Sequence, residues 1–359
     1  MANGAVLSVS IVTGFLGSGK TTLIGRVLRD PAFSRTAVIV NEFGEIGLDH
    51  ELIASSDETL LALTTGCLCC AVRSDLVATL LDLQARRAAG EIEFDRVLIE
   101  TSGLADPAPI LHALMTDTDL ARGYRLDTVL TVVDALHGDN ALDCHPEARR
   151  QAALADRLAL SKTDVAGPVE PLRARLATLN PGAPLAVASD IVPADLFSAG
   201  DPASRAARLA ALPPASARSP FQRAQHSDGI ATFTLQRDRA VPALALTLLL
   251  QALAEHCGAR LLRLKGLVDV AEMPGQPAVI HGVQHVFAPP EFLPRWPSDD
   301  RSTRLVFITQ GVPAHFPARL LEAIEAEVLE ETRAQPGQSV ERRKARGFAP
   351  GTPSRGAAP

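Results

Sequence analysis

The sequence predicts an α/β protein, a doubly wound and mainly parallel P-loop domain followed by a smaller α+β C-terminal domain. Aliphatic and β-branched runs alternate with helical patterns through the first half of the chain, as in parallel sheets covered by helices. The segment 14–21, GFLGSGKT, follows the β-branched run 9–13 and precedes a helical pattern at 22–28. This strand–loop–helix order is the context that a phosphate-binding loop requires. We call residues 14–21 the P-loop.

The P-loop is expected to hold a nucleoside triphosphate and Mg²⁺. Its glycines let the backbone curl so that N–H groups point at an anion, and the new helix adds its positive dipole end. We expect Lys20 to be a solvent-facing charge that reaches the β- and γ-phosphates, and the Thr21 hydroxyl to bind Mg²⁺. The expected phosphate-binding residues are Gly14, Gly17, Ser18, Gly19, Lys20, Thr21 and Thr22.

Length and composition restrict the class of protein. With 359 residues the chain can build two domains, and a net charge of −6 gives no reason to expect nucleic acid as a partner. The apolar run 241–254 is too short to span a bilayer, and residues 1–8 lack the pattern of a signal peptide. Five cysteines, three of them within four positions, do not resemble a disulfide framework. We therefore expect a cytoplasmic protein with no nucleic-acid or membrane partner.

Further buried strands continue the parallel sheet. They are expected at 35–41, 59–64, 95–100, 127–134 and 157–160, with a helix at 72–89. A helix and an edge strand between 165 and 196 are expected to complete this domain. Since ligands bind outside the carboxyl ends of strands in open α/β sheets, the segments that follow these strands are the candidate functional loops.

Acidic residues follow two of these strands. Strand 95–100 ends in Glu100, and Gly103 follows three residues later. P-loop enzymes use such an arrangement for a water-mediated Mg²⁺ contact and for an N–H group at the γ-phosphate. Lys20, Glu100 and Gly103 are therefore the expected catalytic residues. Glu42 and Glu45 lie in the polar segment after strand 35–41, where we expect a metal contact or a switch role.

Three clustered cysteines follow strand 59–64, in the pattern C-x-C-C at Cys67, Cys69 and Cys70. Thiolates favour Zn²⁺ or another borderline metal, and three of them leave a fourth coordination position open. Adjacent Cys69 and Cys70 point to opposite faces of an extended strand, so both bind only if the chain turns there. The alternative is that these residues are small buried hydrophobes. We expect a metal site, with the number of ligating thiolates left open.

The segment 161–164, SKTD, favours guanine. In the N-K-x-D motif of GTPases, the Asp carboxylate accepts two guanine N–H groups that adenine lacks. Asp164 keeps this role, whereas Ser161 stands at the Asn position and is expected to weaken one supporting contact. Ser161, Lys162 and Asp164 are the expected base-binding residues, and GTP is the expected nucleotide.

The second half predicts a separate α+β domain with helices on one sheet face. Strands are expected at 229–236, 260–270, 277–287 and 302–310, and helices at 241–256 and 316–329. The expected organisation is a P-loop GTPase domain at 1–198, a Pro-rich linker at 199–226, the α+β domain at 227–331 and a disordered tail at 332–359.

Together these motifs resemble the CobW-type metallochaperone GTPases of the SIMIBI class. The resemblance covers roughly residues 5 to 330 and rests on segments 14–21, 41–45, 66–70, 100–107, 161–164, 263–266 and 304–308. It implies GTP hydrolysis coupled to the delivery of a divalent metal, often Zn²⁺, to a client protein. Many members carry a His-rich tract, and its absence here removes support for metal storage or cobalt insertion.

Two alternatives remain open at this point. One is an ATP-dependent P-loop kinase, which would need an acceptor pocket with a catalytic base and an Arg-rich lid, and no such segment is found. The other is a metal-binding scaffold that uses nucleotide without significant turnover. The expected cofactors are GTP, Mg²⁺ and Zn²⁺ or another divalent transition metal, and the expected partner is a metal-requiring client protein. The expected metal ligands are Cys67, Cys69, Cys70, Glu42, Glu45 and, for Mg²⁺, Thr21.

Overall fold

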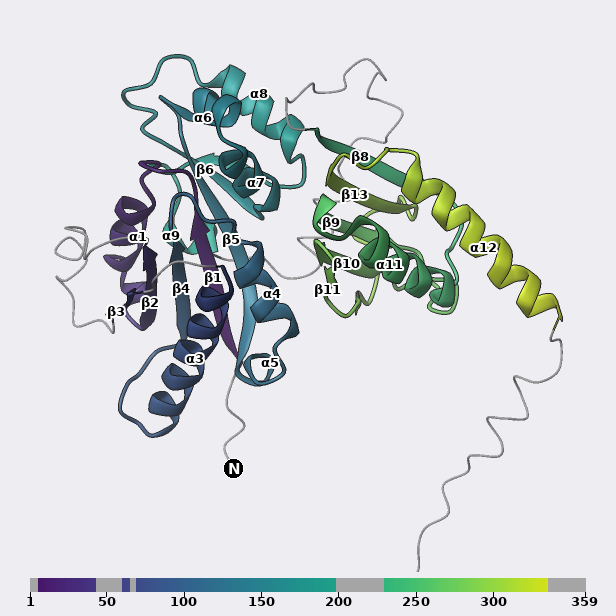
Figure 1. The fold of residues 1–359 in the computed structure, drawn as a ribbon, viewed down its shortest axis with the longest axis horizontal. Helices are drawn as coiled ribbons and strands as arrows, with labels where there is room; N and C mark the ends of the chain where they lie inside the picture. The colour runs from purple at the N-terminus through teal and green to yellow at the C-terminus, as the bar shows by residue number, and fades with distance from the viewer. Residues whose placement is uncertain (1–5, 43–59, 65–68, 198–228, 335–359) are drawn as a thin grey trace, which may run out of the picture.

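The computed structural model describes residues 6–42, 60–64, 69–197 and 229–334, which form two domains side by side (Figure 1). The N-terminal domain ends with the short helix α9 (Pro193–Phe197), and the C-terminal domain begins with strand β8 (Ile230–Arg237). None of the helices in these ranges combines the length and apolar character needed to cross a membrane.

The N-terminal domain is built on a seven-stranded sheet in which every strand pair runs parallel. The strand order is β3-β2-β4-β1-β5-β6-β7. The strands are β1 (Leu7–Thr13), β2 (Thr36–Glu42), β3 (Leu60–Thr64), β4 (Arg96–Thr101), β5 (Tyr124–Asp134), β6 (Arg157–Ser161) and β7 (Leu185–Val187). Val9, Ile11 and Val12 of β1 are fully buried, as expected for a strand covered on both faces. The predicted doubly wound α/β class is confirmed.

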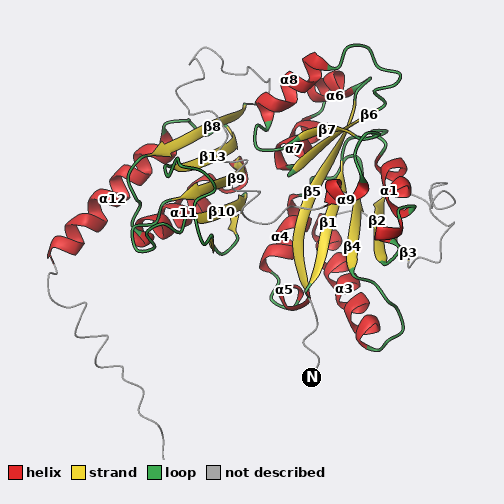
Figure 2. Ribbon diagram, turned by 180° about the vertical axis from the view of Figure 1, so that it is seen from behind, coloured by secondary structure: helices red, strands yellow, loops and turns green. Residues whose placement is uncertain are grey.

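Helices cover both faces of this sheet (Figures 1 and 2). They are α1 (Lys20–Leu28), α3 (Cys69–Ala88), α4 (Ala108–Thr116), α5 (Leu120–Gly123), α6 (Gly138–Cys144), α7 (Pro146–Leu154) and α8 (Glu170–Leu179), besides α9 and the 3₁₀ turn η1 (Pro31–Phe33). On one face Ile24 of α1 packs in a cluster with Val12 of β1. On the other, Leu80 of α3 packs in a cluster with Ile11. Because successive side chains of β1 point to opposite faces of the sheet, Ile11 and Val12 belong to two separate hydrophobic cores.

Several of these helices were missing from the sequence analysis. Helices α4 to α7 have 4 to 9 residues, too few to show a sustained apolar period. Helix α3 begins at Cys69, before the expected start at 72, and strand β5 begins at Tyr124 rather than 127. The expected helix and edge strand after 165 are present as α8 and β7.

The C-terminal domain is an antiparallel six-stranded sheet with two helices on one face. Its order is β11-β10-β9-β13-β8, with β12 paired to β10. The elements after β8 are α11 (Ala243–Cys257), the 3₁₀ turn η3 (Gly258–Arg260), β9 (Leu261–Val268), β10 (Ala278–Val283), β11 (Val286–Phe287), β12 (Glu291–Phe292), β13 (Thr303–Gln310) and α12 (Phe316–Ala334). Leu249 of α11 and Leu321 of α12 share a core with the sheet, and Figure 2 shows both helices behind it. The predicted α+β domain is confirmed.

Two boundaries differ from those expected in this domain. The expected strand 277–287 is a hairpin instead, because Gln284 turns the chain with a φ of 52° between β10 and β11. Helix α12 continues to Ala334, past the boundary at 331. The expected linker at 199–226 and the expected tail beyond 334 lie outside the described residues.

The two domains meet through apolar and charged contacts. Ile230 and Leu262 of the C-terminal sheet belong to one buried cluster with Leu176 of helix α8. Asp156, just before β6, accepts hydrogen bonds from Arg263 and Lys265 of strand β9. The interface therefore reaches the turn that leads into β6, the strand carrying the predicted base-binding residues at its other end.

Candidate nucleotide-binding site

The P-loop leaves strand β1 at a position where only glycine fits. Gly14 has a φ of 145°, and a Cβ there would lie 2.2 Å from the carbonyl oxygen of Val132. The loop closes with the N–H of Ser18 donating to the carbonyl of Phe15 at 3.1 Å, and helix α1 begins at Lys20. The first N–H groups of a helix have no intrahelical partner. Gly17 and Gly19 lie just before α1 with φ values of 68° and 91°, and Thr22 lies in the first turn of that helix. Their shared role in binding phosphate stays a prediction.

Lys20 is buried, which corrects the expectation that it faces solvent. Its side chain lies in the P-loop with 8% exposure, and Nζ donates to the carbonyls of Gly14 at 3.0 Å and Phe15 at 3.4 Å. A buried ammonium group is costly unless it has polar partners, and the curled loop supplies them. A phosphate in the loop would offer the same ammonium a stronger, charged acceptor.

Thr21 and Glu100 meet where strands β1 and β4 end. Parallel pairing sets Val12 opposite Glu100, and the Thr21 hydroxyl donates to Glu100 Oε1 at 2.8 Å. Glu100 is only 1% exposed. A hydroxyl and a carboxylate are hard oxygen ligands of the kind that Mg²⁺ prefers beside nucleotide phosphates. These two residues therefore fit a Mg²⁺ ion at the start of α1.

The segment after β4, residues 102–107, lies directly against the P-loop, and we call it the Gly103 loop. A Cβ on Gly103 would lie 2.7 Å from the backbone nitrogen of Leu16, so the two loops touch through their backbones. Gln151 of helix α7 donates from Nε2 to the carbonyls of Gly103 and Ala105, each at 3.1 Å. The expected role of Gly103 at the γ-phosphate stays a prediction.

The segment 161–164, the base loop, is tied to the P-loop at two points. The Ser161 hydroxyl donates to the carbonyl of Ser18 at 2.6 Å, so the residue in the Asn position still joins the two loops. Lys162 has a φ of 55°, a conformation that non-glycine residues rarely adopt outside functional sites. Its Nζ donates to the carbonyl of Gly17 at 2.7 Å. Asp164 follows on an exposed turn, accessible to a base.

Asp134, which the sequence analysis did not select, holds Lys162 in place. The Lys162 ammonium lies 2.7 Å from Asp134 Oδ2. Burial alone would raise the pKa of Asp134, but hydrogen bonds from Lys162 and the N–H groups of Leu136 and His137 outweigh it and hold the pKa below its usual range. The carboxylate is thus charged at neutral pH. Its position at the end of a buried strand, like that of Glu100, was the signal that could have identified it.

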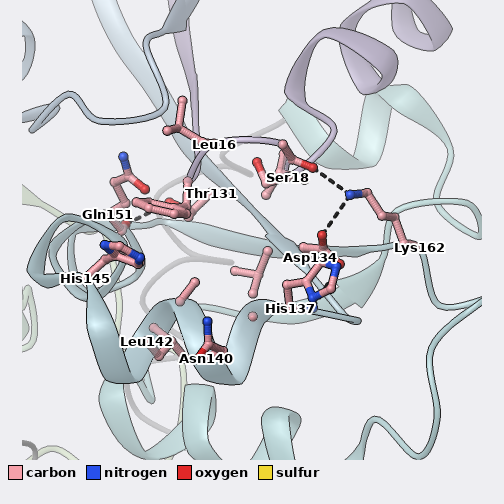
Figure 3. A pocket seen from close by; sticks show the side chains of 17 residues that line it. Leu16, Ser18, Thr131, Asp134, His137, Asn140, Leu142, His145, Gln151 and Lys162 are labelled. Carbon is pink, nitrogen blue, oxygen red and sulfur yellow. Dashed lines mark hydrogen bonds and ion pairs between the residues drawn. The ribbon is translucent and has the colours of Figure 1, made fainter.

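A pocket of about 180 Å³ adjoins the P-loop on the side of helices α6 and α7 (Figure 3). Phe15 of the P-loop stacks on His145, with ring centroids 4.4 Å apart. Gln151 lies in the pocket wall, as does the pair Asp134 and Lys162. Both loops that contact the P-loop are therefore held by side chains that border this pocket.

Most of the predicted metal ligands lie outside the residues whose side chains the structure describes. Cys67 and Glu45 lie outside the described residues, Glu42 is the last residue of β2, and Cys69 and Cys70 open helix α3. Within the described ranges no group of three His, Cys, Asp or Glu side chains could hold a metal. The backbone does set Glu42 opposite Thr64 on neighbouring parallel strands, so the segments following β2 and β3 leave the same sheet edge.

Each of the two domains matches a known protein family. Residues 8–187 match the family described as CobW/HypB/UreG, nucleotide-binding domain, and residues 230–326 match the cobalamin synthesis protein cobW C-terminal domain. The chain is 34% identical over 309 residues to the zinc chaperone YjiA of Escherichia coli, covering 86% of this chain and 95% of that protein.

A second relative and a solved structure of YjiA agree. The chain is 34% identical over 205 residues to the zinc-regulated GTPase metalloprotein activator 1 of Saccharomyces cerevisiae, covering 50% of this chain and 47% of that protein. The crystal structure of Zn(II)-bound YjiA GTPase from E. coli superposes with a TM-score of 0.69 at 29% identity, covering 89% of this chain and 99% of that one.

Proposed function

The chain belongs to the CobW family of P-loop GTPases, and from this premise we propose that it is a metallochaperone that hydrolyses GTP and delivers Zn²⁺ to a client protein. The reaction is GTP + H₂O = GDP + phosphate. The proposed nucleotide-binding residues are those of the P-loop together with Gly103, Ser161, Lys162 and Asp164. The zinc part of the proposal is supported by one relative named a zinc chaperone and by another named a zinc-regulated GTPase metalloprotein activator.

One observation carries the nucleotide part, namely the hydrogen bond of 2.8 Å between Thr21 and the buried Glu100. It sets a carboxylate beside the first turn of α1, the helix that begins with Lys20. Mg²⁺, when bound there, would neutralise charge on the β- and γ-phosphate oxygens. Lys20 adds a second positive charge, and the Gly103 loop offers backbone N–H groups at the same edge.

The register of the strands supports a link between the proposed metal loops and the phosphates. Glu100 pairs with Val12 of β1 on one side and with Val40 of β2 on the other. Strand β3 then flanks β2, and helix α3 begins at Cys69 only five residues after β3 ends. A helix N-terminus favours thiolate over thiol, the form that binds Zn²⁺. In the proposed cycle, GTP orders these loops around Zn²⁺, and hydrolysis releases them so that a client can take the metal.

Linkage makes this cycle testable, because GTP must tighten Zn²⁺ binding by the same factor by which Zn²⁺ tightens GTP binding. A chelator-competition titration of Zn²⁺ is run with GDP and with a non-hydrolysable GTP analogue. We expect tighter Zn²⁺ binding with the analogue, by about 5- to 150-fold. Equal Zn²⁺ affinity in the two nucleotide states overturns the proposed coupling.

One cysteine variant and a matched control test whether the clustered cysteines bind the Zn²⁺. Cys69→Ser should lose the nucleotide-dependent Zn²⁺ affinity, whereas Cys144→Ser is the matched control, since Cys144 is an exposed cysteine at the end of helix α6. Phosphate release from GTP and from ATP, with and without Zn²⁺, separates the alternatives. Turnover of ATP in preference to GTP supports a kinase-like enzyme instead, and Zn²⁺ binding without phosphate release supports a scaffold.

A further inference from the structure

We propose that Gln151 is a positioning residue for GTP hydrolysis: it holds the Gly103 loop in place against the P-loop, and its neighbour Arg150 links that loop to the C-terminal domain. The inference rests on the proposed GTPase function and names two residues of helix α7 that regulate its phosphate site.

The Gln151 side chain is fully buried, and its amide group donates two hydrogen bonds to one loop. Its Nε2 donates to the carbonyls of Gly103 and Ala105, each at 3.1 Å. The backbone of the same residue is fixed as well, because the Thr131 hydroxyl of β5 donates to the Gln151 carbonyl at 2.8 Å. Strand β5 thus anchors the residue that holds the loop.

The remaining polar atom of this side chain shows that Gln151 is not an ordinary core residue. Its Oε1 is buried and has no hydrogen-bond partner among the residues that the structure describes. The amide leaves one buried oxygen unpaired, whereas an apolar side chain would leave the carbonyls of Gly103 and Ala105 without this donor. The structural reason for an amide at this position is the pair of bonds to the Gly103 loop.

These bonds act on the part of the loop that faces the P-loop. The N–H of Ala105 donates to the carbonyl of Ser102 at 3.0 Å, which closes a tight turn around Gly103. With the carbonyls of Gly103 and Ala105 also held, the turn keeps one orientation. Gly103 approaches the Leu16 backbone so closely that a Cβ would lie 2.7 Å from its nitrogen. A shift of the turn would therefore move its N–H groups relative to a bound γ-phosphate.

Arg150 extends the connection to the other domain. Its Nη1 lies 3.4 Å from Asp106 Oδ2 in the Gly103 loop, and its Nη2 donates to Gln310 Oε1 at 3.2 Å. Gln310 is the last residue of strand β13 in the C-terminal domain. Asp106 also accepts from the N–H of Ala108, the first residue of helix α4, at 2.9 Å. Two consecutive residues of α7, Arg150 and Gln151, thus couple the position of the Gly103 loop to the position of strand β13 in the C-terminal domain.

The test uses Gln151→Met in the full-length chain, which keeps the length of the side chain and removes its donors. We measure kcat and KM for GTP, and the affinities for GDP and for a non-hydrolysable GTP analogue. Loss of one preorganised donor to a transition state typically lowers kcat by about 100- to 1,000-fold, so a loosened donor should cost at least about tenfold. Affinity for the analogue should fall, while affinity for GDP, which has no γ-phosphate, stays within about twofold.

Asn180→Leu is the matched control for a purely structural effect. Asn180 is also a buried amide, and its Nδ2 donates to the carbonyls of Ala152 and Ala155 at the end of the same helix, each at 2.9 Å. This variant should lower Tm without changing the ratio of analogue to GDP affinity. If Gln151→Met behaves like Asn180→Leu, the positioning role is overturned.

Arg150→Met keeps the inference testable if Gln151→Met does not fold, because Arg150 is partly exposed. We expect kcat to fall by about two- to tenfold, the equivalent of one net hydrogen bond. Wild-type turnover in both folded variants overturns the inference and leaves the GTPase assignment intact. Wild-type protein that releases no phosphate from GTP overturns the proposed function, and this inference with it.

Discussion

The hydroxyl of Ser161 donates a hydrogen bond of 2.6 Å to the carbonyl oxygen of Ser18, which joins the base loop to the P-loop. The Lys162 ammonium adds a second connection, at 2.7 Å from the Gly17 carbonyl. A nucleotide that touches both loops therefore meets two segments that these hydrogen bonds already join, the P-loop after β1 and the base loop at the end of β6. The serine in the Asn position thus still contacts the P-loop.

Ser161→Ala should weaken GTP binding by about two- to tenfold, because one net hydrogen bond between the loops is lost. Ser161→Asn should keep GTP affinity or raise it modestly. Calorimetry with GTP measures both variants, and Ser189→Ala, a change of an exposed serine outside these loops, is the control. An alanine variant with wild-type affinity would show that the contact to Ser18 does not prepare the site.

Asp164→Ala should remove the preference for GTP over ATP. A carboxylate that accepts two guanine N–H groups makes charge-assisted bonds, and losing one of about 1.5 kcal/mol already lowers affinity about tenfold. Affinity for ATP should change by less than about twofold, because adenine offers no matching donor pair. Glu170→Ala, at an exposed carboxylate on helix α8, controls for the change in net charge. Wild-type protein that prefers ATP would contradict the base assignment itself.

Lys20→Ala should abolish tight nucleotide binding and leave the fold intact. The Lys20 ammonium already lies among the P-loop carbonyls, at 3.0 Å from that of Gly14, so it is in position to meet a phosphate. GTP affinity should fall at least about tenfold, which corresponds to about 1.4 kcal/mol. Arg29→Ala, an exposed charge at the end of the same helix, should bind as wild type does. Circular dichroism checks the fold, and unchanged GTP affinity would mean that the loop is not a nucleotide site.

Thr21→Val should lower Mg²⁺-dependent GTP hydrolysis by at least about tenfold, in the range seen for loss of one group that stabilises the transition state. Valine keeps the shape of threonine but lacks the hydroxyl that lies 2.8 Å from Glu100. Thr21→Ser restores the hydroxyl and should rescue turnover. Phosphate release measured across a Mg²⁺ titration gives both the rate and the metal requirement. The metal assignment fails if Thr21→Val keeps the wild-type response to Mg²⁺.

Asp156→Asn should destabilise the protein most at neutral pH. Burial alone would raise the pKa of Asp156, but the positive charges of Arg263, Lys265 and His281 outweigh it and hold the pKa far below its usual range. A carboxyl group whose pKa is lowered in the folded state stabilises the fold above its unfolded pKa of about 3.9, and this contribution disappears as the pH falls through the folded value. At pH 7 the variant should lose about 3 kcal/mol, the lower range for breaking a buried pair.

The pH dependence of this loss is the decisive measurement. Denaturant unfolding at a series of pH values should show the difference between wild type and Asp156→Asn shrinking below about pH 5. Asp139→Asn, at an exposed carboxylate on helix α6, should show little difference at any pH. A wild-type advantage that stays constant down to pH 3 would exclude a charged Asp156 as its source.

Local pattern was enough to predict most elements and the curled loop between β1 and α1. The β-branched run before Gly14 and the glycines within the P-loop specify a strand and a curled loop through near-neighbour sterics, and the structure has both. The same logic identified Glu100, since a charge that ends a buried strand lies at the ligand edge of a parallel sheet. It would have identified Asp134 as well. Short helices such as α6 and α7 gave too little periodicity to be seen.

The sequence by itself determined the α/β class, through the alternation of strand and helix patterns along the first half of the chain. It also determined the P-loop, the strand-end acid Glu100 and the segment of the base loop, because each of these is encoded within a few consecutive residues. Only the tertiary structure decided that Lys20 is buried, that Ser161 bonds to Ser18 and that Gln151 holds the Gly103 loop. The last two contacts join residues 143 and 48 positions apart. Such contacts depend on the order of the strands in the sheet and on the packing of the helices against it. Burial and long-range pairing therefore follow from tertiary packing and not from any local sequence pattern.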